Sequence, residues 1–310
     1  MAEPLKILFM GTPEFALPSL DKLSQAGEHI IAVVCQPDRP RGRGRKLCSC
    51  PSKKWAAVHN VAVLQPERCK DCGFVDQVRK LAPDLIVVAS FGQILPDELL
   101  AIPKLGALNV HASLLPKYRG ASPIPYAILN GDKETGVTTM QIIRKLDAGP
   151  ILLQRKLPIE PEDTTGTLQE KLAALGAELL VETIDKLKAG KIQPRPQDET
   201  LAVYAPAIKK EQGLIDWREP AEMIWRKVRA FNPWPGAYVG RGDRLLKIWK
   251  AEPAEAGGKP GTILEAHQKW IEVACGKGSL RILELQPAGK KKMTPAAFLA
   301  GHRLGTEFDF

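Results

Sequence analysis

The feature that most constrains the fold is a series of short, continuous apolar runs that alternate with helical patterns. The runs occupy residues 6–10, 29–34, 84–89 and 106–110. Helical spacing occupies residues 14–23, the region around 74–81, and residues 165–188, the clearest amphipathic stretch. Continuous runs rich in Val, Ile and Leu are typical of parallel strands that are buried on both faces and joined by crossover helices. Because such crossovers are right-handed, we predict an α/β fold with a doubly wound, mostly parallel, Rossmann-like sheet.

The pattern changes after residue 188. Residues 189–198 are rich in Pro, Gly and polar side chains, which is typical of a linker. A helical pattern at 219–230 follows, and then short strand-like runs at 237–239, 245–249, 261–264, 270–274 and 280–285. Short strands about ten residues apart, broken by Gly and Pro, favour a smaller OB-like β-barrel. We therefore predict a first domain over 1–190, a linker over 191–208 and a second domain over 209–310.

Positive charge is concentrated in two regions of the chain. The 310 residues carry a net charge of +9. Residues 38–54 hold seven basic side chains and one acidic one, and the chain from residue 207 onward holds 18 basic and 12 acidic ones. This distribution is expected if both regions face a polyanion, although a purely solubilising role explains the charge equally well.

The six cysteines favour a reducing compartment. The N-terminus lacks the basic and apolar regions of an export signal, and no apolar run is long enough to cross a bilayer. We therefore interpret the cysteines as reduced thiols of a cytoplasmic protein that has no membrane partner. Four of them could alternatively form a zinc site, although the first pair has an unusual spacing for one: Cys48, Cys50, Cys69 and Cys72.

Two polar residues end the strand predicted at 106–110. Asn109 and His111 lie two residues apart, so their side chains project from the same face, close to the carboxyl edge where α/β sheets bind ligands. Asp147 lies in a Gly/Pro-rich turn farther along. An amide, an imidazole and a carboxylate can together stabilise an oxyanion and move a proton, which is what acyl transfer requires. Asp147 could alternatively cap its turn.

These residues belong to recognisable motifs. Asn-Val-His at 109–111, the segment Ser-Leu-Leu-Pro-Lys-Tyr-Arg-Gly at 113–120 and Leu-Asp-Ala-Gly at 146–149 resemble the signature of the folate-dependent formyltransferases. Further motifs, in order over nearly the whole chain, resemble the branch of this family that acts on charged tRNA: residues 11–16, 36–45, 91–96, 229–235 and 285–290.

The resemblance implies a reaction and its participants. A formyl group would pass from 10-formyltetrahydrofolate, a co-substrate, to the α-amino group of methionine on charged initiator tRNA, with no metal. Asn109 and a protonated His111 would donate to the oxyanion, and Asp147 would assist the imidazole and help to relay a proton to folate N10. The second domain would hold the acceptor arm of the tRNA.

The resemblance also implies two binding regions. Residues expected to contact folate are Phe91, Gln93, Ile94, Leu95, Ser113, Leu114, Leu115 and Pro116. Residues expected to contact tRNA are Arg41, Arg43, Arg45 and Lys46, with Arg43 as a wedge at the acceptor end. We expect this Arg/Gly-rich segment to be disordered without RNA, because it is charged and has few apolar residues.

Two other function classes stay open at this point. A formyltransferase that acts on a small-molecule amine would not need the basic insertion, and a noncatalytic RNA-binding protein would have no use for the Asn, His and Asp set. The resemblance suggests a monomer.

Overall fold

The computed structural model describes residues 3–41, 46–240, 245–302 and 305–308; the side chains of residues 41, 46 and 47 are not described. Its contacts divide the chain into two compact units. The first unit comprises residues 1–123, 134–158 and 169–205, and the second comprises 124–133, 159–168 and 206–310. Compact units group contacts and need not coincide with independently folding domains, so the limits given above (1–190, 191–208 and 209–310) stay a prediction.

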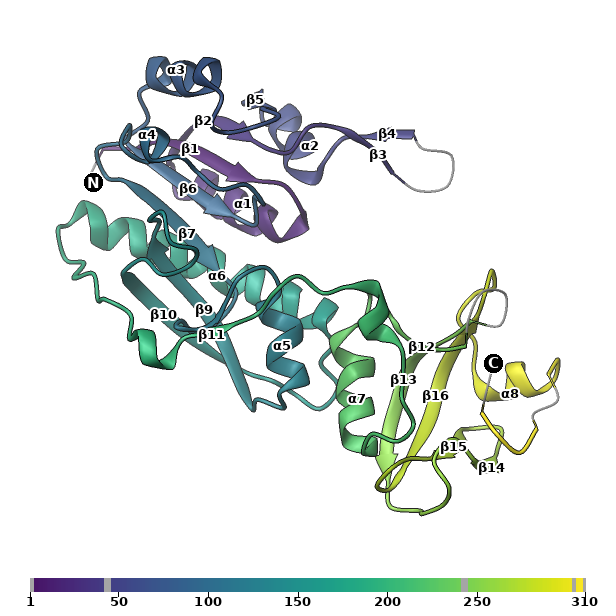
Figure 1. The fold of residues 1–310 in the computed structure, drawn as a ribbon. Coiled ribbons are helices and arrows are strands. Elements are labelled where there is room, and N and C mark those ends of the chain that lie inside the picture. The colour runs from purple at the N-terminus through teal and green to yellow at the C-terminus, as the bar shows by residue number, and fades with distance from the viewer. Residues whose placement is uncertain (1–2, 42–45, 241–244, 303–304, 309–310) are drawn as a thin grey trace. The chain divides into compact units, whose positions relative to one another are not determined.

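The first unit is built on a seven-stranded sheet (Figure 1). Its strands are β1 (Lys6–Gly11), β2 (His29–Val34), β5 (Ala62–Leu64), β6 (Leu85–Ala89), β7 (Ala107–His111), β9 (Glu134–Gln141) and β10 (Ile151–Pro158). Their order is β10-β9-β7-β6-β1-β2-β5. The pairs β1–β2, β1–β6, β2–β5 and β6–β7 are parallel, whereas β7–β9 and β9–β10 are antiparallel. The predicted mostly parallel α/β sheet is confirmed.

Strand β9 has no counterpart among the predicted strands, because threonines interrupt its apolar pattern. Thr138 and Thr139 are fully buried. The Thr138 hydroxyl donates to the Ser113 carbonyl oxygen at 2.7 Å, and the Thr139 hydroxyl lies 2.8 Å from that of Thr183. Hydrogen bonding of this kind lets polar side chains occupy a buried strand.

Helical segments accompany this sheet: η1 (Glu14–Ala16), α1 (Leu17–Gln25), α2 (Pro51–Val58), α3 (Cys72–Leu81), α4 (Asp97–Leu100), α6 (Thr165–Lys188) and η2 (Glu199–Leu201). The prediction for α6 is confirmed at both ends. Gly176 of α6 packs so closely on the sheet that a Cβ there would lie 2.8 Å from Val110 and 3.3 Å from Val137. Since side chains alternate along a strand, Asn109 and His111 project from the face of β7 opposite α6.

Two short strand pairs complete the first unit. Strands β8 (Lys117–Arg119) and β11 (Val203–Tyr204) are parallel. Strands β3 (Arg39–Arg41) and β4 (Lys46–Cys48) form an antiparallel hairpin within the Arg/Gly-rich segment. The expectation of disorder concerns residues 41–45: the backbone of Arg41 is ordered by its pairing with Lys46, and residues 42–45 lie outside the described part of the chain.

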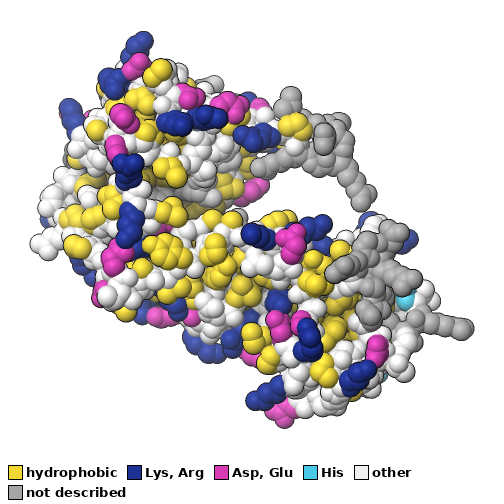
Figure 2. All heavy atoms as spheres, viewed as in Figure 1, with side chains coloured by type: hydrophobic (Ala, Val, Ile, Leu, Met, Phe, Trp, Pro, Cys, Tyr) yellow, Lys and Arg dark blue, Asp and Glu magenta, His cyan; other side chains and the backbone are white. Residues whose placement is uncertain are grey.

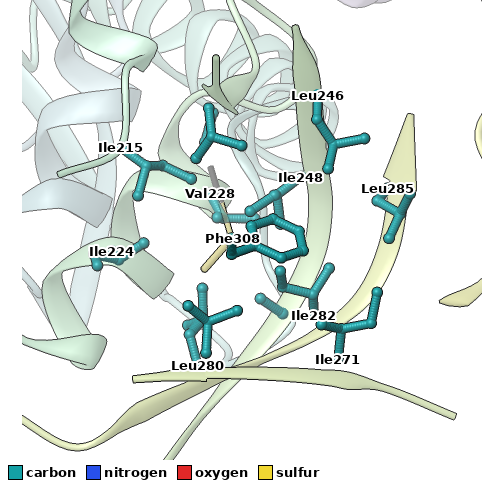
Figure 3. Packing of buried hydrophobic residues seen from close by; sticks show 14 of the residues in the cluster. Ile215, Ile224, Val228, Leu246, Ile248, Ile271, Leu280, Ile282, Leu285 and Phe308 are labelled. Atoms are coloured by element: carbon teal, nitrogen blue, oxygen red, sulfur yellow. The ribbon is translucent and has the colours of Figure 1, made fainter. Parts of the chain in front are cut away.

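The second unit carries a five-stranded antiparallel sheet in the order β12-β13-β16-β15-β14. Its elements are α5 (Pro123–Leu129), η3 (Lys210–Gly213), α7 (Ala221–Ala230), β12 (Ala237–Val239), β13 (Leu246–Ala254), β14 (Ile263–Ala266), β15 (Ile271–Ala274), β16 (Ser279–Pro287) and α8 (Pro295–Leu299). The first residue of α5, Pro123, is grouped with the first unit. In its core, Phe308 lies among aliphatic side chains from α7 and the sheet, including Ile224 and Ile282 (Figure 3). The predicted smaller β-rich second part is confirmed.

Surface charge is mixed where it can be seen. On the face drawn in Figure 2, Lys and Arg side chains are interspersed with Asp and Glu. No helix in the described ranges combines the length and the apolar character that a membrane span requires.

Candidate active site

Asn109, His111 and Asp147 lie together in the first unit. The Asn109 amide Nδ2 is 3.5 Å from Asp147 Oδ1, and His111 Nδ1 is 3.7 Å from Asp147 Oδ2. Asn109 and His111 come from β7, whereas Asp147 comes from the loop between β9 and β10. Strand β9 runs antiparallel to β7 and ends beside Leu108, so this loop must return over β7 to bring its carboxylate to the other two side chains.

The two nitrogens of His111 have different environments. The side chain is almost fully buried, and Nε2 lies 2.8 Å from the carbonyl oxygen of Tyr118. A carbonyl oxygen only accepts, so Nε2 carries a hydrogen and donates it. The neutral ring therefore has its lone pair on Nδ1, the nitrogen that faces Asp147. His111 can gain or lose a proton only at Nδ1 without breaking a buried hydrogen bond.

The Asp147 carboxylate is fixed from a second side. Its Oδ2 atom accepts a hydrogen bond from the backbone N–H of Gly120 at 2.8 Å. The backbone of Asp147 has a φ of +47°, a left-handed conformation that non-glycine residues seldom adopt. Such a residue keeps this conformation only where its surroundings impose it, so the loop is shaped by its contacts.

The segment 113–118 is held against the sheet by side-chain hydrogen bonds. The Ser113 hydroxyl donates to the Lys117 carbonyl oxygen at 2.7 Å. Gln154 of β10 donates to the Leu115 carbonyl oxygen at 2.8 Å. These contacts fix the backbone that accepts the hydrogen bond from His111.

The residues predicted to contact folate differ in exposure. Phe91, Leu95, Ser113 and Leu115 are buried, whereas Ile94 is 82% exposed; Leu114 and Pro116 are half-buried. The loop after β6 contains Ser90 and Gly92 at positive φ, +53° and +86°. The buried side chains thus anchor a turning backbone, on which Ile94 is exposed.

Gln93 has a structural role as well. Its Oε1 accepts from the Cys69 backbone N–H at 2.9 Å, and its Nε2 donates to the Pro66 carbonyl oxygen at 3.3 Å. Gln36 donates to the Phe91 carbonyl oxygen at 3.2 Å. The side chain of Gln93 is therefore used to hold its own loop.

Charged and polar side chains hold the base of the Arg/Gly-rich segment, which is the point where β3 begins. Lys53 Nζ lies 2.5 Å from Asp38 Oδ2 and 2.9 Å from Gln65 Oε1. The hydrogen bond from Lys53 holds the pKa of Asp38 below its ordinary value. The residues predicted to bind tRNA lie beyond this base: Arg43 and Arg45 fall outside the described residues, and the side chains of Arg41 and Lys46 are not described either.

All six cysteines are free thiols. Within the described ranges, no group of three or more His, Cys, Asp or Glu side chains could hold a metal ion, so the alternative zinc site finds no support there. Cys50 instead caps α2, and its sulfur accepts from the Lys53 backbone N–H at 3.4 Å. A hydrogen bond from the Cys35 thiol lowers the pKa of Cys50 to about 6, whereas the pKa of Cys35 is raised.

Two residues near the site were not singled out from the sequence. Gln197 donates to the carbonyl oxygens of Asp147 and Gly149, and the buried Arg119 donates to Gln197. Arg119 lies within a motif quoted above, but Gln197 lies in the segment predicted to be a linker. A glutamine that follows a proline in a polar, Pro-rich segment gives no local signal of such contacts.

Comparison with known proteins places the chain among its relatives. A family model described as formyl transferase matches residues 5–184, and one described as formyl transferase, C-terminal domain, matches residues 207–303. The methionyl-tRNA formyltransferase of Pelobacter propionicus is 53% identical over 295 residues, which cover 95% of this chain and 92% of that protein. The methionyl-tRNA formyltransferase of Geobacter sulfurreducens is 51% identical over 301 residues, with coverage of 97% and 95%.

Solved structures share the fold. HypX from Aquifex aeolicus in complex with tetrahydrofolic acid superposes with a TM-score of 0.67 at 20% identity, covering 96% of this chain and 47% of that one. WlaRD, a sugar 3N-formyl transferase solved in the presence of dTDP and 5-N-formyl-THF, gives a TM-score of 0.68 at 20% identity, with coverage of 93% and 100%.

Proposed function

The chain belongs to the methionyl-tRNA formyltransferase family, and we propose that it transfers the formyl group of 10-formyltetrahydrofolate to the α-amino group of methionine on charged initiator tRNA. The relatives and both family models confirm the resemblance to formyltransferases. The observation that carries the proposed chemistry is the meeting of an amide, an imidazole and a carboxylate at Asn109, His111 and Asp147.

The nucleophile needs little activation. An α-amino group has a pKa of about 8, so a substantial fraction is neutral at cellular pH. Its nitrogen attacks the formyl carbon, the new C–N bond forms, and the bond from that carbon to folate N10 then breaks. The attacking nitrogen must lose a proton, and N10 must gain one. A site for this reaction therefore has to stabilise an oxyanion and carry one proton.

Asn109 suits the oxyanion. An amide nitrogen has two hydrogens, and the contact with Asp147 uses one of them, which leaves the other to donate to the formyl oxygen as it gains charge. Donors fixed before the reaction stabilise a developing charge more effectively than water does, because they need no reorganisation.

His111 and Asp147 are suited to transfer the proton from the amine to folate N10. Because Nε2 donates to the Tyr118 carbonyl oxygen, His111 would take the amine proton on Nδ1. The Asp147 carboxylate at 3.7 Å stabilises the resulting imidazolium, which can donate to the oxyanion and then pass the proton to N10. These steps use neither a metal nor a covalent enzyme intermediate.

We place folate against the loop after β6 and the segment 113–116, where the backbone is held by buried side chains and Ile94 is exposed. We place the acceptor end of the tRNA near the β3–β4 hairpin, with Arg41, Arg43, Arg45 and Lys46 as phosphate or base contacts. The family resemblance suggests a monomer, and a substrate used in translation initiation places its action in the cytoplasm.

The direct test is formylation of charged initiator tRNA with 10-formyltetrahydrofolate. Uncharged initiator tRNA and charged elongator methionyl-tRNA serve as controls, and an amino-sugar nucleotide tests the alternative of a small amine. Formylation of the sugar but not of the tRNA would contradict the proposal. Phosphate contacts also predict that tRNA affinity falls steeply with salt and falls in Arg43→Ala; a flat salt dependence would contradict the tRNA surface.

Single variants test the chemistry. Asn109→Leu should lower the single-turnover rate by roughly 100- to 1000-fold, the usual cost of removing an oxyanion donor. His111→Gln and Asp147→Asn should also slow the transfer while tRNA affinity stays close to that of the wild type. The exposed His29, in the same unit, provides the control His29→Gln. A normal single-turnover rate in any of the three site variants would remove that residue from the mechanism.

A further inference from the structure

The loop that carries Asp147 depends on contacts from outside itself. Asp147 has a positive φ, and such a backbone conformation is kept only where neighbouring groups impose it. One oxygen of its carboxylate is fixed by the N–H of Gly120. The position of the main chain on either side of the carboxylate must be fixed as well, since a shift of the main chain would carry the carboxylate away from His111.

Gln197 supplies that fixation. Its Nε2 donates to the carbonyl oxygen of Asp147 at 2.9 Å and to that of Gly149 at 2.8 Å. A primary amide has two N–H groups, so both of its donors are used on one loop. Gln197 is 50 residues beyond Asp147 in the chain. Its segment is attached to the sheet, because Arg195 and Ile151 exchange two backbone hydrogen bonds.

The amide of Gln197 can point in only one direction. Its Oε1 accepts from Arg119 Nε at 3.0 Å and from Nη2 at 2.8 Å. Arg119 is fully buried and makes a two-pronged pair with Glu199, with N–O distances of 3.0 and 3.1 Å. A guanidinium only donates and a carbonyl oxygen only accepts, so an amide between them cannot flip. Arg119 also immediately precedes Gly120, the residue that holds the carboxylate.

We propose that Gln197, oriented by Arg119, is a positioning residue that holds the Asp147 carboxylate at the distance from His111 and Asn109 that formyl transfer needs. This role rests on the proposed function, because it assigns Gln197 to the same reaction. Arg119 is therefore linked to both groups that hold Asp147: it orients Gln197, which binds the main chain of Asp147, and it adjoins Gly120, which binds the Asp147 carboxylate.

Gln197→Met tests the proposal, because methionine has nearly the same shape and cannot make the hydrogen bonds. We expect kcat for formylation of methionyl-tRNA to fall roughly 10- to 100-fold, with KM for both substrates little changed, as is usual when a supporting group is lost. Gln197→Glu should behave alike, since it keeps an acceptor for Arg119 and lacks the donor. The matched control is Gln193→Met, four residues earlier and exposed, which should keep wild-type rates.

A double-mutant cycle separates positioning from general damage. If Gln197 acts through the carboxylate, adding Gln197→Met to Asp147→Asn should lower kcat by less than about threefold, because residues that act as a unit are not additive. A full additional loss in the double variant, or a wild-type rate in Gln197→Glu, would overturn the proposal.

A crystal structure of Gln197→Met tests whether Gln197 positions the Asp147 carboxylate, and it does not depend on an activity measurement. The proposal requires the Asp147 carboxylate to leave the Gly120 N–H or to move away from His111, and an unmoved carboxylate would overturn it. Failure of the wild type to formylate methionyl-tRNA would instead contradict the proposed function, and the crystal structure would still decide whether Gln197 positions Asp147.

Discussion

Gly149→Ala is the substitution for which the structure gives the clearest magnitude. A Cβ at position 149 would lie 1.8 Å from the carbonyl oxygen of Gln141 and 2.9 Å from its carbon, 1.2 Å closer to that oxygen than the 3.0 Å limit for real Cβ contacts. Gln141 ends β9, and its N–H donates to the Pro150 carbonyl oxygen at 3.0 Å. The strand is held on both sides in the sheet, so the loop must move instead.

The displacement of that loop sets the expected effect. Asp147 is two residues away, and a shift of about 1 Å in a reacting group can cost roughly 100-fold in rate. Forcing an extra carbon into a packed site also costs about 1–3 kcal/mol of stability. We therefore expect Gly149→Ala to remain folded, to bind both substrates, and to transfer the formyl group about 100 times more slowly.

Single-turnover formylation measures the rate, and urea denaturation measures the stability. The matched control is Gly73→Ala in α3, where a Cβ meets nothing within 4 Å; it should keep the wild-type rate and gain up to about 1 kcal/mol of helix stability. A rate in Gly149→Ala within threefold of the wild type would refute the reasoning, because the loop could then move without disturbing the chemistry.

Three further predictions concern pH, thiols and packing. Hydrogen bonds from Arg119 and a lysine lower the pKa of Glu199 from 4.5 to about 2, so the stabilisation that this carboxylate gives to the fold is complete above pH 4.5 and is lost as the pH falls toward 2. The free energy of unfolding, measured by urea denaturation, should therefore depend less on pH in Glu199→Gln than in the wild type over this range. An equal pH dependence in the two proteins would contradict the pairing. Cys35→Ala should raise the pKa of Cys50 above about 6, because the hydrogen bond from the Cys35 thiol is the largest cause of its lowering. Thiolate absorbance during a pH titration, taken as a difference from a variant that also lacks Cys50, measures this pKa. An unchanged midpoint would count against the hydrogen bond between the two thiols. Phe298→Ala removes a fully buried ring from the core of the second unit and should cost about 3–5 kcal/mol in urea denaturation, whereas a loss below 1 kcal/mol would mean that the core refills the space.

Local patterns predicted the central strands of the first sheet, the strands of the second and the longer helices. Helix α6 begins and ends where its amphipathic spacing does, and the apolar runs of β1, β2, β6 and β7 form adjacent strands. These elements depend on residues that are neighbours along the chain. Strand β9 has no continuous apolar run because it contains threonines, and these can be buried because they find hydrogen-bond partners on other elements.

The candidate site likewise combines features that are local in the sequence with features that depend on tertiary contacts. The sequence by itself determined that Asn109 and His111 share one face of a strand, since alternation along a strand is a local rule. Only the tertiary structure decided that Asp147 reaches them, that Nδ1 is the nitrogen of His111 that can exchange a proton, and that Gln197 holds the loop. Each of these facts is a contact between residues separated in sequence, set by how the loops close over the sheet. The residue types present along the chain do not encode such closure locally.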